Sequence, residues 1–372
     1  MNFDLFFPYS LALVLTGVCV AVAFRPEPSS LRTLTRLLLV PAVLFAFFGG
    51  GSVFREVAGG GNRGPRAPLR IASVLDRGTT DALISAFEAQ TGVECEVDAF
   101  AGGTQTTLDL ILQERIRPDV LLGGTVELHQ ILAEANRLRP YEPLPDPERD
   151  DGYDDPNHQW TPLYLGYLAI VYRPLPSLAS HAPDWSTLVE PRWAGRVSIP
   201  SPGASGGGFV FLATQLQRHE DEQIGWDYME LLRQRGVRWE TRSSIPIGRV
   251  GAGTMDLAVA WAHDTLRRRE EERLPIEMEI PEATGYEVGG VSILASSRLP
   301  EAAEQLVQFL TGARATEIQV THGRRVPLRH DVEPPEYLRR ASPRVDHFDR
   351  ARVLRERERW LSRWGDMSNG AR

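Results

Sequence analysis

Apolar and polar positions alternate from residue 69 onward in a way that predicts strands and helices in turn. Short apolar runs indicate buried strands, and Leu83, Ile84 and Phe87 fall on one face of a helix that Gly92 ends. Strands are expected at 69–75, 93–100 and 119–122, and helices at 81–91 and 106–115. Strands and helices in this order, joined by short Gly- and Thr-rich turns, predict an open parallel α/β sheet with ligands at the carboxyl ends of its strands.

A second block continues the alternation after a polar, Pro- and Asp-rich stretch at 140–160. Strands are expected at 168–172, 196–199, 237–240, 257–261 and 285–294. Helices are expected at 209–218, at 222–235, from residue 264, at 300–322 and at 350–364. The last helix is amphipathic, so it either packs on the domain or binds a partner or a membrane surface.

The first 54 residues predict one or two transmembrane or signal-like helices. Segments 5–24 and 37–54 carry no charged residue, and each is about long enough to cross a bilayer core of roughly 30 Å. Three arginines and one glutamate lie between them, so the positive-inside rule predicts a cytoplasmic loop with both ends outside. Residues 1–54 would then hold the chain at the cell membrane, with 55–68 as a flexible Gly- and Pro-rich linker to a periplasmic or extracytoplasmic domain.

Other interpretations of this segment remain open. The second hydrophobic run, which follows Arg32 and Arg36, resembles a signal peptide, and Cys19 is a conceivable lipoprotein cleavage site with a poor match before it. Both alternatives also export the rest of the chain. The last one, two buried core helices of a soluble protein, agrees less well with the flanking arginines.

Composition narrows the chemistry that the chain can perform. All 41 basic residues are Arg, so Schiff-base formation, pyridoxal-phosphate attachment and Walker-A nucleotide binding, which need a lysine amine, are excluded. The formal net charge of −8 argues against nucleic acid as a partner. Cys19 and Cys95 are too few for a disulfide framework, and no HExxH or CxxC motif occurs. The sequence therefore predicts neither an enzyme nor a cofactor.

Three Gly-rich turns at strand ends are candidate ligand contacts. The strongest, 201–208, lies between a predicted strand and helix, where backbone N–H groups and serine hydroxyls bind anions without lysine. Two others, 102–105 and 123–125, lie in the first block, and a plain flexible turn is the alternative for each. His263 is either a surface residue or a metal ligand. The Arg- and Glu-rich run 267–273 is expected to be a solvated helix.

Five segments share their order and spacing with a known family. They are 69–78, 118–124, 160–174, 184–208 and 287–310. Together they resemble ABC-importer extracellular solute-binding proteins of the iron(III)/phosphonate-binding type.

This resemblance implies the two-lobed, α/β type II periplasmic-binding-protein fold over residues 69–345. Lobe 1 would hold about 69–163 plus 287–330, and lobe 2 about 170–284. Residues 346–372 would be a C-terminal amphipathic helix and tail.

The resemblance also implies which residues meet the ligand. From the first lobe these are Ser73, Thr104 and Thr125. From the second they are Ser201, Ser205, Gly206 and Gly207, the last in place of the threonine usual in the family. Asp76, Tyr164, Trp261 and Asp264 complete the expected ligand-binding set.

One departure from the family bears on the ligand. Iron(III) binders carry an adjacent tyrosine pair after the strand at 257–261, where this chain has Ala262, His263 and Asp264. Ferric iron favours anionic oxygen ligands, so the missing phenolates argue against it, although Asp76, His263 and Asp264 stay weak metal-ligand candidates. A phosphonate- or organophosphate-like anion, and other small polar solutes such as carboxylates, are the remaining ligand classes.

These observations predict a membrane-tethered, extracytoplasmic solute-binding component of an ABC importer. Its partners would be a small-molecule or ion ligand, the ABC permease subunits and, through the N-terminal segments, the membrane. Capture of a solute needs only a higher affinity in the closed form, not catalysis. A membrane-anchored ligand sensor with the same bilobal domain is the alternative.

Overall fold

The computed structural model describes residues 67–99, 104–178, 182–341 and 343–369. The hydrophobic segments predicted within residues 1–54, and nearly all of the predicted linker, lie outside the described residues. Among the residues that are described, no helix is both long and apolar enough to cross a membrane. They belong to the unit that begins at Ala67.

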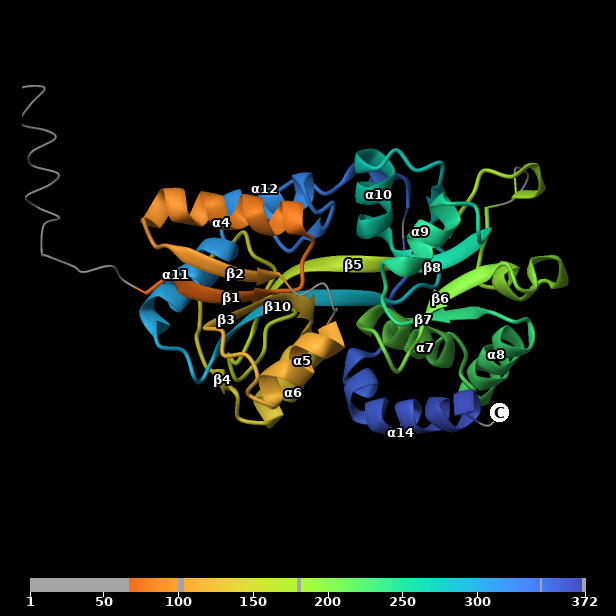
Figure 1. The fold of residues 1–372 in the computed structure, drawn as a ribbon, viewed down its shortest axis with the longest axis horizontal. Helices are drawn as coiled ribbons and strands as arrows, with labels where there is room; N and C mark the ends of the chain where they lie inside the picture. The colour runs from red at the N-terminus through yellow and green to blue at the C-terminus, as the bar shows by residue number, and fades with distance from the viewer. Residues whose placement is uncertain (1–66, 100–103, 179–181, 342, 370–372) are drawn as a thin grey trace, which may run out of the picture. The chain divides into compact units, whose positions relative to one another are not determined.

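A mixed β-sheet organises this unit, and its first strands are parallel as predicted. β1 (Leu69–Ser73) lies between β2 (Cys95–Ala99) and β3 (Val120–Thr125), and all three run in one direction (Figure 1). β10 (Tyr286–Leu294) pairs with β3 in the antiparallel direction. The sheet is therefore not parallel throughout, because a strand from the far end of the chain returns into it.

β5 (Thr161–Tyr172) is shared between the two halves of the sheet. Its first part pairs with β10 and its last part with β8 (Leu257–Trp261), both antiparallel. β6 (Val197–Pro200) and β7 (Arg238–Glu240) continue the sheet beyond β8. We call the half with β2, β1, β3 and β10 the first lobe and the half with β8, β6 and β7 the second lobe.

Helices pack on the sheet in both lobes (Figure 1). Those of the first lobe are α4 (Arg77–Thr91), α5 (Thr104–Leu112), α6 (Val126–Glu134), α11 (Pro300–Leu310) and α12 (Ala313–Thr321). Those of the second lobe are α7 (Gly206–Gln217), α8 (Glu222–Gln234), α9 (Ile245–Gly251) and α10 (Ala262–Glu271). The C-terminal part holds α13 (Glu336–Arg340) and α14 (Arg350–Asn369).

Shorter elements complete the fold. They are the strands β4 (Leu138–Arg139), β9 (Glu277–Glu279) and β11 (Val326–Pro327), and 3₁₀ turns at Pro176–Leu178, Thr187–Val189 and Pro191–Trp193.

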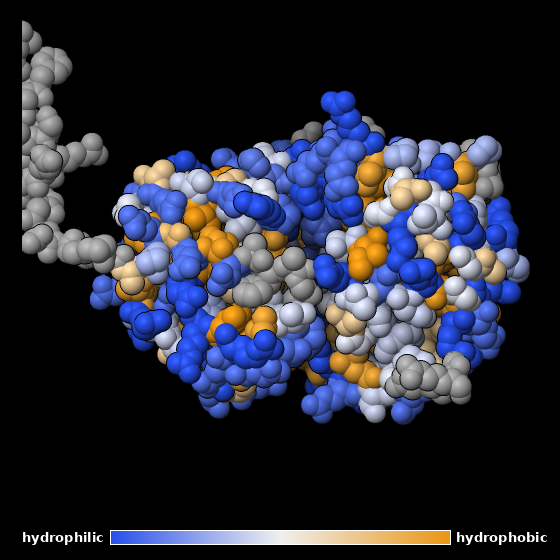
Figure 2. Space-filling view, viewed as in Figure 1, coloured by the Kyte–Doolittle hydropathy of each residue, from blue (hydrophilic) through white to orange (hydrophobic). Residues whose placement is uncertain are grey.

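Each lobe has a hydrophobic core of its own. In the first lobe, Ile71 of β1 packs in one cluster with Phe87 of α4 and Leu306 of α11. In the second lobe, Phe211 of α7 and Trp226 of α8 belong to a separate cluster. Charged and polar residues cover most of the face seen in Figure 2, with apolar residues scattered among them. Two separate cores leave the boundary between the lobes available for polar side chains.

Two predicted helices differ most from the observed ones, and a local feature of the chain explains each difference. The helix predicted at 81–91 begins earlier, because the Asp76 carboxylate accepts a hydrogen bond from the Thr79 amide and caps α4. The single helix predicted at 300–322 is two helices. The chain turns at Gly312, whose extended backbone (φ −77°, ψ 160°) precedes α12.

The sequence pattern also fails to predict α6 and α9. The turn expected at 123–125 is instead the end of β3, with Gly123 and Gly124 at positive φ (83° and 84°), and α6 follows at once. The C-terminal helix predicted at 350–364 continues to Asn369 and packs on the domain.

Candidate functional site

A polar cavity of about 240 Å³ lies where the two lobes meet. The first lobe contributes the carboxyl ends of β1 and β3 and the start of α5. The second lobe contributes the start of α7, the loop at 241–244, and the junction of β8 with α10. Tyr164 on β5 and Glu287 on β10 add side chains from the strands that connect the lobes. The cavity thus forms at strand ends, where α/β sheets bind ligands.

Six of the eleven predicted ligand-binding residues line this cavity. They are Asp76, Thr104, Tyr164, Ser205, Trp261 and Asp264, and His263 lies among them. Thr125 and Gly206 instead line a smaller crevice of about 30 Å³, which α5, α6, α7 and α14 surround. Thr104 and Ser205 line both spaces, so the crevice adjoins the cavity.

The other three predicted residues, Ser73, Ser201 and Gly207, are not among the residues that line the cavity or the crevice. The Ser73 hydroxyl is buried, 2.8 Å from that of Thr80. Ser201 uses its backbone carbonyl to accept the Ser205 amide. A Cβ on Gly207 would lie 2.7 Å from the Ser243 hydroxyl, so the glycine leaves room for that side chain.

Asp76 joins the N-terminus of α4 to two arginines. Its carboxylate accepts the Thr79 amide at 2.9 Å and lies 3.1 Å from Arg325 Nη1 and 3.8 Å from Arg267 Nε. Burial raises the pKa of Asp76, but Arg325, Thr79 and Arg267 outweigh it and hold this pKa below the ordinary value. Asp76 is therefore ionised at neutral pH.

Arg325 is a buried cation of the first-lobe wall. Its side chain is 3% exposed, and its guanidinium carbon lies 4.8 Å from the centre of the Tyr164 ring. Burial lowers the pKa of this guanidinium, but Tyr164, Asp76 and the other carboxyl groups nearby raise the pKa by more. Arg325 therefore stays charged. Burial also raises the pKa of Tyr164, so the phenol is neutral. The wall combines a fixed positive charge with an uncharged aromatic ring.

His263 and Glu287 meet at the lobe boundary. His263 Nε2 lies 3.8 Å from a Glu287 carboxyl oxygen, and the side chains are 3% and 6% exposed. Burial lowers the pKa of His263 to about 4 and raises the pKa of Glu287 to about 8, so both are mainly neutral at pH 7. His263 Nδ1 is buried and has no hydrogen-bond partner among the described residues. A polar atom of this kind in a cavity wall is one that a ligand or water can satisfy.

The second-lobe wall presents hydroxyl groups and the guanidinium group of an arginine. The Ser205 hydroxyl accepts the Gly208 amide at 3.1 Å and caps α7, whose N-terminus carries partial positive charge. Ser243 and Ser244 face the same cavity from the loop at 241–244. Arg242 in that loop is exposed, and its side chain makes no ion pair or hydrogen bond with any described residue.

The sequence pattern does not identify Arg267, Arg325 or Glu287 as residues of the cavity. Arg267 belongs to the run predicted to be solvated, which is wrong for this residue, because its side chain is only 16% exposed. Helical spacing could have found it, since it lies one turn after Asp264 on α10. Arg325 and Glu287 reach the cavity from late parts of the chain, and no local pattern marks them.

The predicted metal candidates come together, but in an environment that opposes a cation. Asp76, His263 and Asp264 line one cavity. Arg325 and Arg267 flank Asp76, and Arg267 Nη2 lies 3.6 Å from Asp264. Within the part of the chain that the structure describes, no three His, Cys, Asp or Glu side chains are grouped to hold a metal ion.

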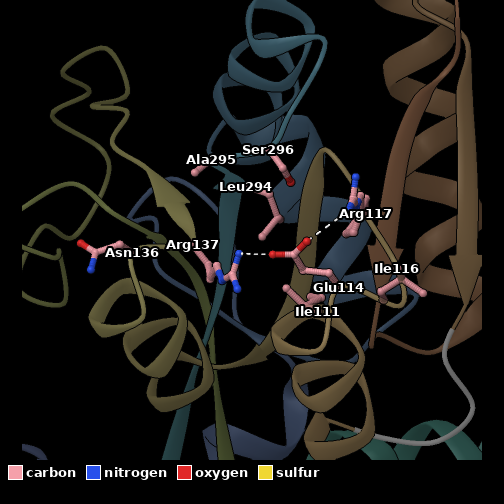
Figure 3. Close-up of a pocket in the computed structure, with 10 residues that line it drawn as sticks. Ile111, Glu114, Ile116, Arg117, Asn136, Arg137, Leu294, Ala295 and Ser296 are labelled. Atoms are coloured by element: carbon pink, nitrogen blue, oxygen red, sulfur yellow. Dashed lines mark hydrogen bonds and ion pairs between the residues drawn. The ribbon is translucent and has the colours of Figure 1, made fainter.

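Another pocket, of about 210 Å³, lies at the opposite edge of the first-lobe sheet (Figure 3). In it the Glu114 carboxylate lies between two arginines, 3.1 Å from Arg117 and 2.8 Å from Arg137. This edge holds the amino ends of the parallel strands and none of the predicted ligand-binding residues. It is therefore the weaker candidate for a solute site.

Comparisons with known proteins agree with the fold and with a binding role. A family model described as a bacterial extracellular solute-binding protein matches residues 71–325. A protein of Haemophilus influenzae described as uncharacterized is 28% identical over 264 residues, which are 68% of this chain and 73% of that protein.

Solved structures share the fold at low sequence identity. The periplasmic binding protein AfuA from Actinobacillus pleuropneumoniae, solved with exogenous fructose-6-phosphate bound, is 22% identical with a TM-score of 0.71, over 81% of this chain and 98% of that one. Iron-bound HitA from Pseudomonas aeruginosa is 20% identical with a TM-score of 0.68, over 81% and 99%. A two-component system protein described as mediating signal transduction is 17% identical with a TM-score of 0.67, over 79% and 100%.

These likenesses confirm the predicted α/β periplasmic-binding fold. The prediction of a binding protein rather than an enzyme is also confirmed, because the matching family consists of solute-binding proteins. The match spans well over half of the chain, so the protein belongs to the bacterial extracellular solute-binding proteins.

Proposed function

We propose that this protein captures a small organic anion outside the cytoplasm and passes it to the permease of an ABC importer. The observation that carries the proposal is Arg242, a guanidinium in the cavity wall with no partner among the described residues. Hydrogen bonds from a guanidinium to a phosphate or carboxylate are among the strong ones, and Arg offers two parallel donors. Ser243, Ser244 and the N-terminus of α7 add further donors on the same side.

The other side of the cavity supports a solute that also carries hydroxyl groups. The Asp76 and Asp264 carboxylates are acceptors there, and neutral His263 and Glu287 offer further polar atoms. A phosphorylated or phosphonate-like solute would set its anionic group against Arg242 and its hydroxyl groups against the carboxylates. The structure of AfuA with fructose-6-phosphate supports this class, because that protein has the same fold.

The size of the cavity supports a metabolite rather than a larger molecule. Its volume of about 240 Å³ lies below the range of roughly 300–1,000 Å³ typical of pockets for drug-sized ligands. Iron(III) is disfavoured, since no adjacent tyrosine pair follows β8 and arginines flank the carboxylates. We therefore propose an organic anion as the ligand, and the binding test below also includes iron(III).

The N-terminal segments support a tether to the membrane. Residues 5–24 and 37–54 are uncharged in the sequence, and a Gly- and Pro-rich stretch follows them. A domain held close to the bilayer stays near its permease, which raises its effective concentration there.

Thermal-shift and calorimetric titration of the full chain in detergent test the proposal. The probes are fructose-6-phosphate, methylphosphonate, inorganic phosphate and iron(III) citrate. A ligand at a hundred times its dissociation constant stabilises the folded state by about 2.7 kcal/mol, so a true ligand raises the melting temperature clearly. We expect a phosphorylated or phosphonate probe to do so. Stabilisation by iron(III) citrate alone contradicts the proposal.

A membrane-anchored sensor is the second candidate. The likeness to a two-component signalling protein favours it, because that protein has the same fold. Deleting the gene separates the two functions. Lost uptake of the solute supports import, whereas unchanged uptake with a lost transcriptional response supports sensing.

A further inference from the structure

We infer that α14 is an interlobe latch, fixed to the second lobe and tied to the first lobe by the ion pair between Arg350 and Glu127. The latch forms through contacts between side chains of the described residues. It does not depend on which solute is bound.

The anchoring of α14 to the second lobe is extensive. Trp360 and Trp364 of α14 are buried in the same hydrophobic cluster as Phe209 of α7. Arg352 and Arg359 each lie 2.8 Å from the Glu222 carboxylate of α8. Figure 1 shows α14 lying along α7 and α8. When the second lobe moves, α14 therefore moves with it.

One end of this helix reaches the first lobe. Arg350 Nη2 lies 3.6 Å from the carboxylate of Glu127, in the first turn of α6, and the two side chains are only 18% and 9% exposed. The other Glu127 oxygen is buried and has no hydrogen-bond partner among the described residues. Because little water reaches this pair, salt screens it less than a surface pair.

Arg357 brings a second positive charge toward the same carboxylate. It lies about two turns beyond Arg350 on α14 and lines the crevice with Glu127 and Phe209. Its guanidinium lies over the Phe209 ring at 5.1 Å, and its Nε is buried without a hydrogen-bond partner in the described part of the chain. Glu127 of the first lobe thus faces two cations that belong to the second.

The crevice adjoins the solute cavity, so the latch lies where lobe movement must change distances. Thr104 and Ser205 line both spaces. A rotation of one lobe against the other about β5 and β10 alters the separation of α6 and α14 and stretches the Arg350–Glu127 pair. Separating a buried pair leaves charges without compensation, which is costly. The latch also lies in a helix outside residues 71–325, which the family model matches.

Distances between spin labels on the two lobes test the latch without any solute. Labels are attached to Ser85→Cys on α4 and Gln234→Cys on α8, both exposed, in the full chain with Cys19 and Cys95 replaced by Ser. The spin-label distances of the parent chain define a main population and a less populated one. We expect Glu127→Gln to increase the less populated one at least about fivefold, which is the size of effect that typical coupling free energies produce. Arg350→Gln should give the same change and serves if Glu127→Gln does not fold.

Glu114→Gln is the matched control, because it removes a Glu–Arg pair confined to the first lobe. Its distance distribution should equal that of the parent. Exchanging the charges in Glu127→Arg with Arg350→Glu should restore the parent distribution. Distributions for Glu127→Gln and Arg350→Gln that match the parent overturn the latch, and this result leaves the anion proposal untouched.

Discussion

The carboxylate of Asp76 lies 3.1 Å from the guanidinium of Arg325, although 249 positions separate the two residues in the chain. Asp76 caps α4 near the start of the first lobe, and Arg325 directly precedes β11 in the segment that returns last. The same guanidinium lies over the ring of Tyr164. One wall of the solute cavity is therefore built from three distant parts of the sequence.

Removing Arg325 should destabilise the folded state and change its acid sensitivity. Arg325→Gln removes the buried positive charge that pairs with the Asp76 carboxylate. We expect this loss to lower the free energy of unfolding by about 3 kcal/mol at pH 7. The folded pKa of Asp76 lies below its unfolded value of about 3.9, so its stabilisation is present above that pH and is lost as pH falls further. Urea unfolding at pH 7 and at pH 3 checks both.

Arg325→Lys retains the positive charge and serves as the comparison for this prediction. It should lose less stability than Arg325→Gln and keep more of the acid limb. Equal free energies of unfolding for the parent and Arg325→Gln at pH 7 contradict the assignment.

Glu287 should weaken the fold as pH rises. Its folded pKa of about 8 lies above the unfolded value of about 4.3, so the folded state binds the proton more tightly and loses stability between these two pH values. Glu287→Gln, which stays neutral, should melt near the parent at pH 5 and above it at pH 8. Melting temperatures across this range check the result, and parallel curves for the two proteins would refute it.

His263 should act in the opposite direction on the acid side. Its folded pKa of about 4 lies below the unfolded value of about 6.5, so the unfolded state takes up the proton first and stability falls from pH 6.5 to pH 4. His263→Gln removes the titrating group, so its melting temperature should depend less on pH than the parent's between pH 6.5 and pH 4. Thermal melts through that interval are the measurement, and an acid limb as steep as the parent's contradicts the prediction.

Arg242→Gln should weaken anion binding without affecting the fold. A hydrogen bond to a charged group contributes about 1.5–3 kcal/mol, so we expect the dissociation constant for fructose-6-phosphate to rise about 10- to 100-fold. The melting temperature should not change, because the side chain is exposed and holds no described residue. Calorimetric titration measures the affinity. Arg314→Gln, at an exposed position of α12, is the control, and equal affinity in both variants removes Arg242 from the site.

Local sequence patterns predict those parts of the fold that local physics decides. The alternation of apolar runs gives β1, β2 and β3, and Gly92 ends α4 in the left-handed conformation with φ 70°. The pattern fails where a single residue changes a helix boundary. Asp76 extends α4 toward its N-terminus by capping it, and the turn at Gly312 divides a continuous amphipathic stretch into two helices.

The cavity is predicted only in part, for a related reason. Ser205 is identifiable because it lies in a Gly-rich turn at a strand end, a local feature with a known use in binding. Arg325 and Glu287 come to the cavity through β11 and β10, which pair with β5 from distant parts of the chain. Their role depends on strand pairing, which single-sequence periodicity does not specify. Arg267 is an intermediate case, because helical spacing alone places it one turn after Asp264 on α10.

The topology of the chain is open to a direct test. Alkaline phosphatase is active only after export, so a fusion after residue 70 should be active if the solute-binding domain lies outside the cytoplasm. A fusion within residues 25–36, the loop predicted to be cytoplasmic, should be inactive and serves as the control. An expressed but inactive fusion after residue 70 would invert the proposed orientation.

Two neighbouring glycines at the start of α7 should respond differently to a single methyl group. A Cβ on Gly208 would lie 2.3 Å from the backbone carbonyl oxygen of Ser201, which has little freedom to move, so we expect Gly208→Ala to cost about 1–3 kcal/mol of stability. A Cβ on Gly207 would meet the Ser243 hydroxyl, a side-chain atom that can rotate away from the cavity. Gly207→Ala should therefore keep the melting temperature nearly unchanged and weaken binding of fructose-6-phosphate. Thermal melts and calorimetric titration of both variants check this. A large loss of stability in Gly207→Ala, or none in Gly208→Ala, would show that the packing described around α7 is wrong.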